Sequence, residues 1–180
     1  MLPRWPAEWE KHERTWMAWP SAGYTLGDTD EDADEARRTW AAVANAIVKH
    51  EPVSMVVDPE AVKTASEWLD PRVDLVIAPL DDAWMRDIGP TFVKSSDGQR
   101  LGVDWVFNGW GAQSWATWGK DAEIGRTVLN ETDTPVISSS MVNEGGGIHT
   151  NGNGIVLVTE TVQLDSGRNP GWTRDDVERE

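Results

Sequence analysis

Apolar residues recur at helical spacing in the first third of the chain. The recurring positions are Ala36, Trp40, Val43 and Ile47, and this spacing predicts an amphipathic helix. Asp30 is expected to cap its N-terminus, because a short polar side chain accepts a hydrogen bond from a free N–H group of the first turn. His50 and Pro52 are expected to end it.

Short apolar runs without polar alternation predict buried strands at Val53–Val57 and at residues 73–80. Between them, Asp58 followed by Pro59 predicts a second helix, because proline suits the first helical position. Residues 5–20 show no clear period and are expected to form an extended arm that packs on this scaffold.

Two stretches of the chain then share one order of elements. In the first, the strand at residues 73–80 leads to a polar loop with Asp87 and to a predicted hairpin at residues 91–93 and 102–107. A helix is predicted at residues 120–129.

The second stretch repeats this order. The strand Val136–Val142 leads to Glu144 and to a predicted hairpin at Ile148–Thr150 and residues 155–164. The repeat lies in the order of elements, because the two stretches share almost no sequence identity. It predicts an α/β fold built from similar units.

Composition places the chain among globular proteins. It has 180 residues, enough for one modest domain or part of a larger one, with 39% hydrophobic and 26% charged residues. No apolar run is long enough for a membrane span. The formal charge of −15 disfavours nucleic acids and anionic membranes as partners, and it favours a cationic ligand or simple solubility.

The residue types present narrow the chemistry. The chain has no cysteine, which excludes disulfides, thiolate metal sites and a cysteine nucleophile within it. Its histidines, His12, His50 and His149, show no metal-ligand spacing, and neither a metal nor a cofactor is expected. Nucleotide-binding and α/β-hydrolase motifs are missing. Twelve tryptophans are more than a core of this size requires.

Residues 81–90 form the first candidate site. Trp84 and Asp87 can converge on one ligand, because an indole face and a carboxylate together suit a planar cation. Asp82, in the same loop, is expected to be solvated. The alternative interpretation is a structural Arg86–Asp87 pair or a helix-capping aspartate.

A glutamate followed by three glycines, Glu144 to Gly147, forms the second candidate site. Glycines permit close approach by a ligand, although a flexible hairpin entry with a surface glutamate is the alternative. If the repeated units pack around a common axis, Asp87 and Glu144 come to the same end of it. Two carboxylates placed there would hold one guanidinium through charge-assisted hydrogen bonds.

The third candidate is the loop at residues 108–115. Small residues alternate there with tryptophans, and Asn108 and Trp110 are its candidate binding residues. The loop is expected to line an aromatic pocket, with hydrophobic packing under the hairpin as the alternative.

Five motifs resemble, in order and spacing, the agmatine deiminases and the related bacterial peptidyl-arginine deiminases. They are Trp9-Glu10-x-His12-Glu13-x-Thr15-Trp16-Met17-Ala18-Trp19-Pro20, Trp84-x-Arg86-Asp87-x-Gly89-Pro90-Thr91, Asn108-x-Trp110-Gly111, Glu144-Gly145-Gly146-x-Ile148-His149 and Arg168-Asn169-Pro170. The resemblance implies a pseudo-fivefold propeller of ββαβ units, the pentein-like fold, here truncated after about two to three units.

The resemblance also implies a chemistry. Family members hydrolyse a guanidinium to a ureido group and release ammonia, using a cysteine nucleophile, a histidine acid–base and carboxylates that grip the guanidinium. On the matching positions Asp87 is the catalytic carboxylate, Trp84 a wall of the pocket and Glu144 a second carboxylate. Asn108 and Trp110 are expected to complete the substrate-binding set.

Two family motifs are missing, Gly-His-x-Asp with the catalytic histidine and Gly-Cys-Gly with the cysteine. Residues 1–180 are therefore expected to be the N-terminal portion of a single catalytic domain, cut inside a helix that begins near Thr173. The fragment would supply guanidinium-binding carboxylates and pocket tryptophans.

Substrate choice follows from charge. No arginine lies between Trp105 and Lys120, where the peptidyl-arginine deiminases of this family carry arginines that bind a substrate carboxylate. We therefore expect conversion of agmatine to N-carbamoylputrescine, for putrescine biosynthesis in the cytoplasm. The alternatives are a peptidyl-arginine deiminase or a non-catalytic tryptophan-rich binding module, and a homo-oligomer is left open.

The 180-residue chain by itself is expected to produce no ureido product from agmatine, because it has no cysteine to attack the guanidinium carbon. A colorimetric ureido assay on the purified chain tests this expectation, with the full-length protein as the positive control. Turnover by the chain alone would contradict it.

Overall fold

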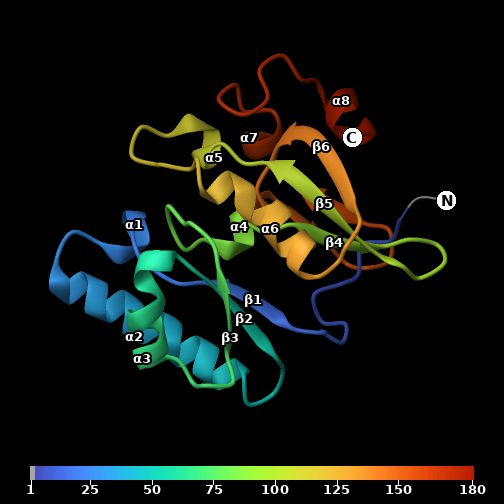
Figure 1. Cartoon of the computed structure of the whole chain (residues 1–180). Helices are drawn as coiled ribbons and strands as arrows, with labels where there is room; N and C mark the ends of the chain where they lie inside the picture. Colours follow the sequence, from blue (N-terminus) through green and yellow to red (C-terminus); the bar gives the residue numbers. More distant parts are fainter. Residues whose placement is uncertain (1–2) are drawn as a thin grey trace. The chain divides into compact units, whose positions relative to one another are not determined.

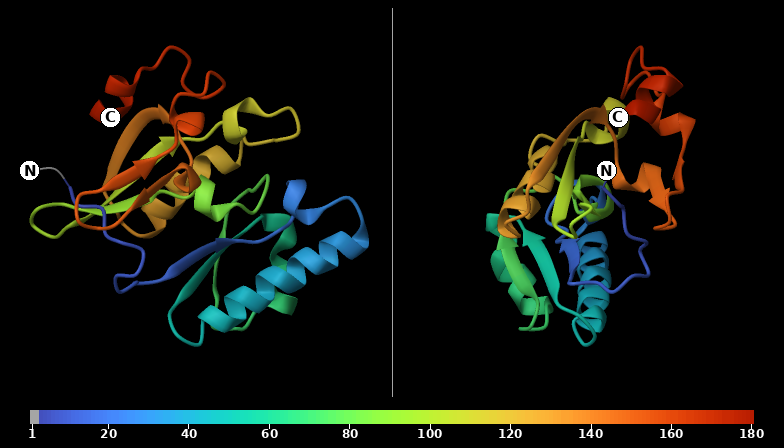
Figure 2. Two further views of the ribbon diagram at one scale, coloured as in Figure 1. Left: turned by 180° about the vertical axis from the view of Figure 1, so that it is seen from behind. Right: turned by 90° about the vertical axis from the view of Figure 1, so that its right-hand side faces the viewer.

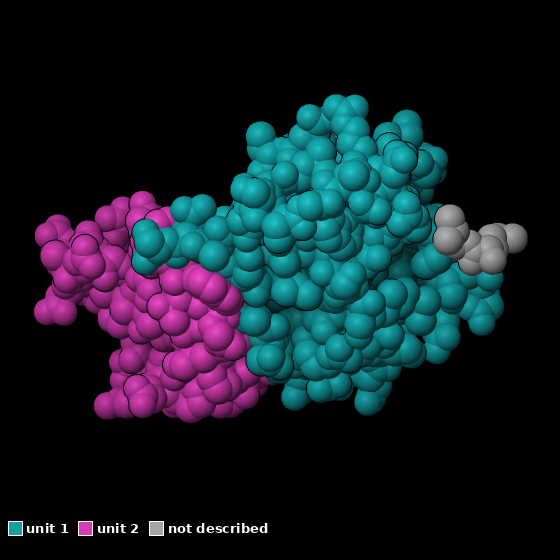
Figure 3. Space-filling view, turned by 90° about the horizontal axis from the view of Figure 1, so that it is seen from above, with its two compact units in different colours: residues 1–10, 86–114, 122–180 teal, residues 11–85, 115–121 magenta. Residues whose placement is uncertain are grey.

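The computed structural model describes residues 3–180 (Figure 1). The chain divides into two compact units, which Figure 3 colours separately. Unit 1 holds Arg86–Ser114, Ala122–Glu180 and the described residues up to Glu10, whereas unit 2 holds Lys11–Met85 and Trp115–Asp121. No helix within residues 3–180 is long and apolar enough to cross a membrane.

Unit 2 is built on a parallel three-stranded sheet in the order β1-β2-β3. Its strands are β1 (Thr15–Ala18), β2 (Val53–Val57) and β3 (Asp74–Ile77). Every residue of β2 is buried, because this apolar strand lies in the middle of the sheet. The predicted extended arm thus contributes a true edge strand, since residues 15–18 pair with β2 along its length.

Helices cover this sheet. They are α1 (Gly23–Leu26), α2 (Asp30–Ile47), the 3₁₀ turn η1 (Pro59–Ala61) and α3 (Val62–Trp68). The buried core joins them to the strands and consists of Trp19, Ala41, Ala44, Val53, Met55, Val57, Ala65, Leu69 and Val73. Two further views show α2 running beside the sheet (Figure 2).

The cap of α2 differs from the prediction. Asp30 is the first helical residue, and Thr29 is the cap. The Thr29 hydroxyl accepts from the Asp32 N–H at 3.1 Å, and the Asp32 carboxylate accepts from the Thr29 N–H at 3.1 Å. This reciprocal capping box satisfies two free donors, which an Asp30 cap alone would not do. The predicted cap at Asp58 is confirmed.

Unit 1 contains a mixed sheet in the order β4-β5-β6, in which β4 and β5 are antiparallel and β5 and β6 parallel. A separate antiparallel pair is formed by β7 and β8. The strands are β4 (Thr91–Lys94), β5 (Arg100–Val106), β6 (Val136–Val142), β7 (Ile148–Thr150) and β8 (Val156–Val158).

The remaining helices of the chain are short. The elements are α4 (Met85–Ile88), α5 (Gly109–Ala112), η2 (Asp121–Glu123), α6 (Ile124–Glu131), η3 (Gly145–Gly147), α7 (Glu160–Gln163) and α8 (Arg174–Arg179). The predicted strand at residues 155–164 is therefore too long. It stops at Val158, because Gln163 turns inward as a buried polar residue and its Oε1 accepts from the Thr159 N–H at 3.1 Å.

The predicted repeat of strand, carboxylate segment and hairpin is confirmed. Strand β3, Asp87 and the hairpin β4–β5 are followed, after helix α6, by β6, Glu144 and the hairpin β7–β8. Asp87 lies in the short helix α4 and not in the predicted loop. The chain therefore has the α/β fold that its pattern predicted. An arrangement of the units around one common axis stays a prediction.

Replacement of Gly102 on β5 tests the packing of unit 1. A Cβ at this position would lie 2.1 Å from Cδ2 of Leu129, which is fully buried in α6 and cannot swing into solvent. Gly102→Ala should lower the free energy of unfolding by about 1–3 kcal/mol through overpacking. Gly119→Ala is the matched control, because nothing lies within 4 Å of its Cβ position. Equal denaturation midpoints of the two variants would contradict the packing described here.

Candidate active site

Asp87 lies in α4, in unit 1, and is partly exposed. Its Oδ2 accepts from the Trp110 indole N–H at 3.0 Å, and its Oδ1 accepts from the backbone N–H of Gly146 at 3.0 Å. The Arg86 guanidinium donates to the Glu8 carboxylate at 2.6 Å. This contact disagrees with the alternative interpretation, an Arg86–Asp87 pair. Each Asp87 oxygen keeps a further lone pair that can accept from a ligand.

A left-handed turn brings Trp110 to Asp87. Its φ is 59° at Trp110, 90° at Gly111 and 56° at Ala112, a conformation that costs free energy for the two non-glycine residues. Asn108 fixes the turn, since its Oδ1 accepts from the Gly111 N–H at 2.9 Å and its Nδ2 donates to the Gly167 carbonyl at 2.9 Å. Both polar atoms of Asn108 are therefore engaged by the backbone.

Glu144 is buried, with 3% of its surface exposed. Its Oε1 accepts from Nε and from Nη2 of Arg168, both at 2.8 Å. Arg168 also donates from Nη1 to Asp165 at 3.0 Å. Burial raises the pKa of Glu144 above its ordinary value, Arg168 acts in the opposite direction, and the negative charge of Asp87 raises the pKa further.

Two of the three glycines after Glu144, Gly145 and Gly146, let two segments of unit 1 touch. A Cβ on Gly145 would lie 2.2 Å from the Arg86 carbonyl oxygen, and one on Gly146 would lie 2.5 Å from Oδ1 of Asp87. Any side chain here would separate the loops. The Asp87 and Glu144 loops therefore meet, as the repeat of elements predicted, and the glycines serve that contact.

Arg168 and Asn169 are site residues that the sequence analysis left without a role. Asn169 holds the end of β6, because its Oδ1 accepts from the Val142 N–H at 2.9 Å and its Nδ2 donates to the Val142 carbonyl at 2.9 Å. The sequence signal for these two residues was the Arg168-Asn169-Pro170 motif. The partners Glu144 and Val142 lie more than twenty residues away along the chain, so the linear pattern showed only a turn.

Asp82 is not solvated, and the expectation for it is wrong. The residue is buried and accepts from the backbone N–H groups of Tyr24 at 3.0 Å and Ala83 at 2.8 Å. Its Oδ2 also accepts from the Trp84 indole N–H at 3.1 Å. The burial of this carboxylate is offset by its hydrogen bonds from the backbone N–H groups of Tyr24 and Ala83, which would otherwise be unpaired. Trp84 belongs to unit 2, so its convergence with Asp87 stays a prediction.

Asp121 is a second buried acid in unit 2, and the sequence offered no signal for it. Its Oδ1 accepts from the Asp81 N–H at 2.8 Å and its Oδ2 from the Asp82 N–H at 3.1 Å. Burial raises the pKa of Asp121 to about 6, against these hydrogen bonds. The acidic segment before Trp84 is thus held in place by another acid.

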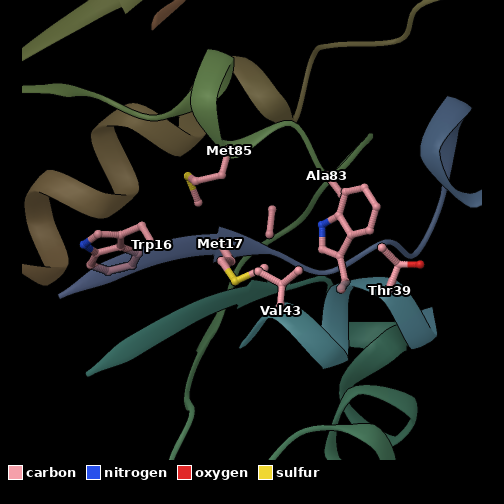
Figure 4. A pocket seen from close by; sticks show the side chains of 8 residues that line it. Trp16, Met17, Thr39, Val43, Ala83 and Met85 are labelled. Carbon is pink, nitrogen blue, oxygen red and sulfur yellow. The ribbon is translucent and has the colours of Figure 1, made fainter. Parts of the chain in front are cut away.

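Unit 2 also has an apolar cavity of about 340 Å³ (Figure 4). Its lining comes from β1, from α2 and from the segment that leads into α4. It consists of Trp16, Met17, Ala18, Thr39, Trp40, Val43, Ala83 and Met85, the first residue of α4. This lining contains no ionisable side chain. It can accommodate apolar groups, but it offers no side chain that transfers a proton.

Two carboxylates from repeated strand–loop–hairpin units, held by a glycine-rich loop, are features expected of a guanidino-group-modifying enzyme. The family of Porphyromonas-type peptidyl-arginine deiminases matches residues 4–180, and the chain belongs to it.

Individual relatives agree with this assignment. A Streptomyces coelicolor protein provisionally named agmatine deiminase is 59% identical over 180 residues, which are 100% of this chain and 53% of the relative. The agmatine deiminase of Stutzerimonas stutzeri is 40% identical over 178 residues, 96% of this chain and 48% of the relative. The chain spans about half the length of the curated relatives it matches.

A solved structure confirms the fold class. The agmatine deiminase of Enterococcus faecalis superposes with a TM-score of 0.91 at 31% identity, and the match covers 98% of this chain and 49% of that chain.

Arg168→Gln should lower the free energy of unfolding of the full-length protein by about 3–5 kcal/mol at pH 7.5, because it leaves a buried carboxylate unpaired. The pKa of Glu144 is raised in the folded state, so its ionisation opposes folding once the pH exceeds its unfolded pKa. The loss should therefore shrink at pH 4.5, where Glu144 becomes protonated.

Denaturant unfolding at the two pH values measures this loss. Adding Glu144→Gln to Arg168→Gln should restore most of the stability. Arg179→Gln, which removes an exposed arginine that binds Asp176, is the control and should cost less than about 1 kcal/mol. A loss that does not change with pH would show that Arg168 acts independently of the Glu144 charge.

Proposed function

We propose that the full-length protein hydrolyses agmatine to N-carbamoylputrescine and ammonia, as a step of putrescine biosynthesis. The observation that carries the proposal is the meeting of the Asp87 and Glu144 loops through the Gly146–Asp87 hydrogen bond. Asp87 raises the pKa of Glu144, so the two negative charges interact in a largely buried place. A cation bound beside them would relieve this repulsion.

Asp87 is proposed to grip the guanidinium. Trp110 and Gly146 each donate to a different oxygen of this carboxylate, so its orientation is set before a ligand arrives. Its remaining lone pairs can accept two parallel N–H bonds from a planar guanidinium. Asn108 supports this arrangement indirectly by fixing the turn that presents Trp110.

Glu144 is proposed to supply negative potential at the substrate, in a position set by Arg168. The Arg168 guanidinium favours the ionised form of Glu144 against burial, and the ionised acid can attract a second cation. Trp84 is proposed as a pocket wall, because the residue is 37% exposed while its indole N–H is engaged by Asp82.

The bond-breaking groups are proposed to lie outside this chain. A cysteine thiolate would add to the guanidinium carbon, and ammonia would leave after a histidine protonates it. Water would then cleave the thiouronium to release the ureido product and regenerate the thiol. A reduced thiol of this kind suits the cytoplasm, which is the proposed location.

Agmatine is preferred over peptidyl-arginine as the substrate. No arginine lies between Trp105 and Lys120 to bind a substrate carboxylate, and the net charge of −15 favours a dication. The names of the Streptomyces and Stutzerimonas relatives support the same choice. Peptidyl-arginine remains the second candidate because the matching family is described by that activity. Assays of the full-length protein on both substrates separate the two.

Asp87→Asn in the full-length protein should lower kcat/KM for agmatine by about 30-fold or more. Loss of a charge-assisted pair in a desolvated site costs about 2–5 kcal/mol, and each 1.36 kcal/mol corresponds to a factor of ten. Asp28→Asn is the matched control, because Asp28 is exposed. Asp82→Asn is unsuitable, since Asp82 binds loop N–H groups.

Melting temperatures of both variants provide the folding check. Equal kcat/KM values for Asp87→Asn and Asp28→Asn, with both proteins folded, would remove Asp87 from the proposed site.

A further inference from the structure

Two large aromatic side chains of unit 2 are exposed and lie against each other. Tyr24, in α1, is 74% exposed, and Trp115 is 56% exposed. Their ring centroids are 5.5 Å apart, with an angle of 53° between the ring planes. Single exposed apolar residues are common, whereas a contiguous group indicates a binding surface.

The buried carboxylate of Asp82 joins Trp84 to this pair. Its Oδ2 accepts from the Tyr24 backbone N–H at 3.0 Å and from the Trp84 indole N–H at 3.1 Å. Two residues that are distant in sequence thus bind the same oxygen. Trp84, Tyr24 and Trp115 all belong to unit 2, and we call them the aromatic surface.

A second buried acid fixes the segment that carries Trp115. Residues 115–121 end at Asp121, whose carboxylate accepts from the Asp81 N–H at 2.8 Å and from the Asp82 N–H at 3.1 Å. Asp81 in turn accepts from the Lys120 N–H at 2.7 Å. Burial of a carboxylate costs free energy unless it is hydrogen-bonded. Here two such acids tie three separate segments together, and the exposed rings on those segments are held in fixed positions.

The residues around the aromatic surface carry negative charge. Residues 15–36, which include Tyr24, contain no lysine or arginine. The exposed acids that follow Tyr24 are Asp28, Asp30 and Glu31. Lys120, the nearest basic residue to Trp115 along the chain, lies 3.5 Å from the Asp58 carboxylate. Aromatic faces in a negative potential suit an organic cation, because the ring quadrupole attracts positive charge.

We infer that the aromatic surface binds the ammonium end of the substrate, through cation–π contacts with Tyr24 and Trp115. This inference rests on the proposed hydrolysis of agmatine, whose primary amine lies at the end of a four-carbon chain opposite the guanidinium. Trp84 precedes Asp87 by three residues, so the backbone keeps their Cα atoms within about 11 Å. The second positive charge of agmatine is thereby assigned to aromatic faces, and the guanidinium stays with Asp87.

The substrate preference of the full-length protein tests the inference. The measured quantity is kcat/KM for agmatine divided by kcat/KM for 1-butylguanidine, which lacks only the ammonium group. We expect this ratio to be about ten or more in the unmodified protein. Tyr24→Leu and Trp115→Leu should each lower it about threefold or more, because leucine keeps an apolar side chain but has no ring face.

Tyr24→Phe provides the rescue, since it keeps the ring and should change the ratio less than twofold. Trp9→Leu is the matched control, because Trp9 is 72% exposed and lies in unit 1, outside the aromatic surface. None of these substitutions changes the net charge, so long-range attraction of the dication is equal in all of them. Melting temperatures verify that each variant is folded.

An unchanged ratio in both leucine variants, with agmatine still converted, would overturn the inference and leave the proposed function in place. Equal losses on both substrates would also overturn it, because they would show a contact that does not involve the ammonium group. Failure of the unmodified full-length protein to convert either substrate would instead refute the proposed function, and this inference with it.

Discussion

The burial of Glu144 beside Asp87 is the constraint on which the candidate site depends. Two carboxylates in a poorly solvated place repel each other, and one of them has almost no access to water. Arg168 offsets this cost with hydrogen bonds to Glu144, and the glycine loop lets the backbone of Gly146 reach Asp87. The site therefore holds negative charge that is only partly neutralised, which is the condition for attracting a cation.

Hydrogen bonding separates structural acids from candidate ligand acids in this strongly acidic chain. Asp82 and Asp121 are buried, and their oxygens accept from backbone N–H groups that would otherwise be unpaired. Asp87 also accepts two hydrogen bonds, but it stays partly exposed, so a ligand can reach it. The net charge of the chain does not distinguish the structural acids Asp82 and Asp121 from the candidate ligand acid Asp87.

The tryptophans also have more than one purpose. Trp84 and Trp110 donate to carboxylates, and Trp105 donates to the Thr91 hydroxyl at 2.9 Å. Each indole thereby combines a large apolar surface with one directed N–H group. This use explains part of the tryptophan excess without a separate tryptophan-rich binding module, and Trp19 stands apart because its N–H has no acceptor in the described structure.

The sequence by itself determined the strands β2 and β6, the cap at Asp58 and the placement of Asp87 and Glu144 at equivalent points between a strand and a hairpin. These depend on local periodicity, turn residues and repetition, which a linear pattern records. Only the tertiary structure decided that Arg168 compensates Glu144, that Asp82 is buried, and that the strand after residue 155 stops at Val158. Each of these rests on a partner for a buried polar group, and when that partner is distant in sequence, local propensity cannot reveal it.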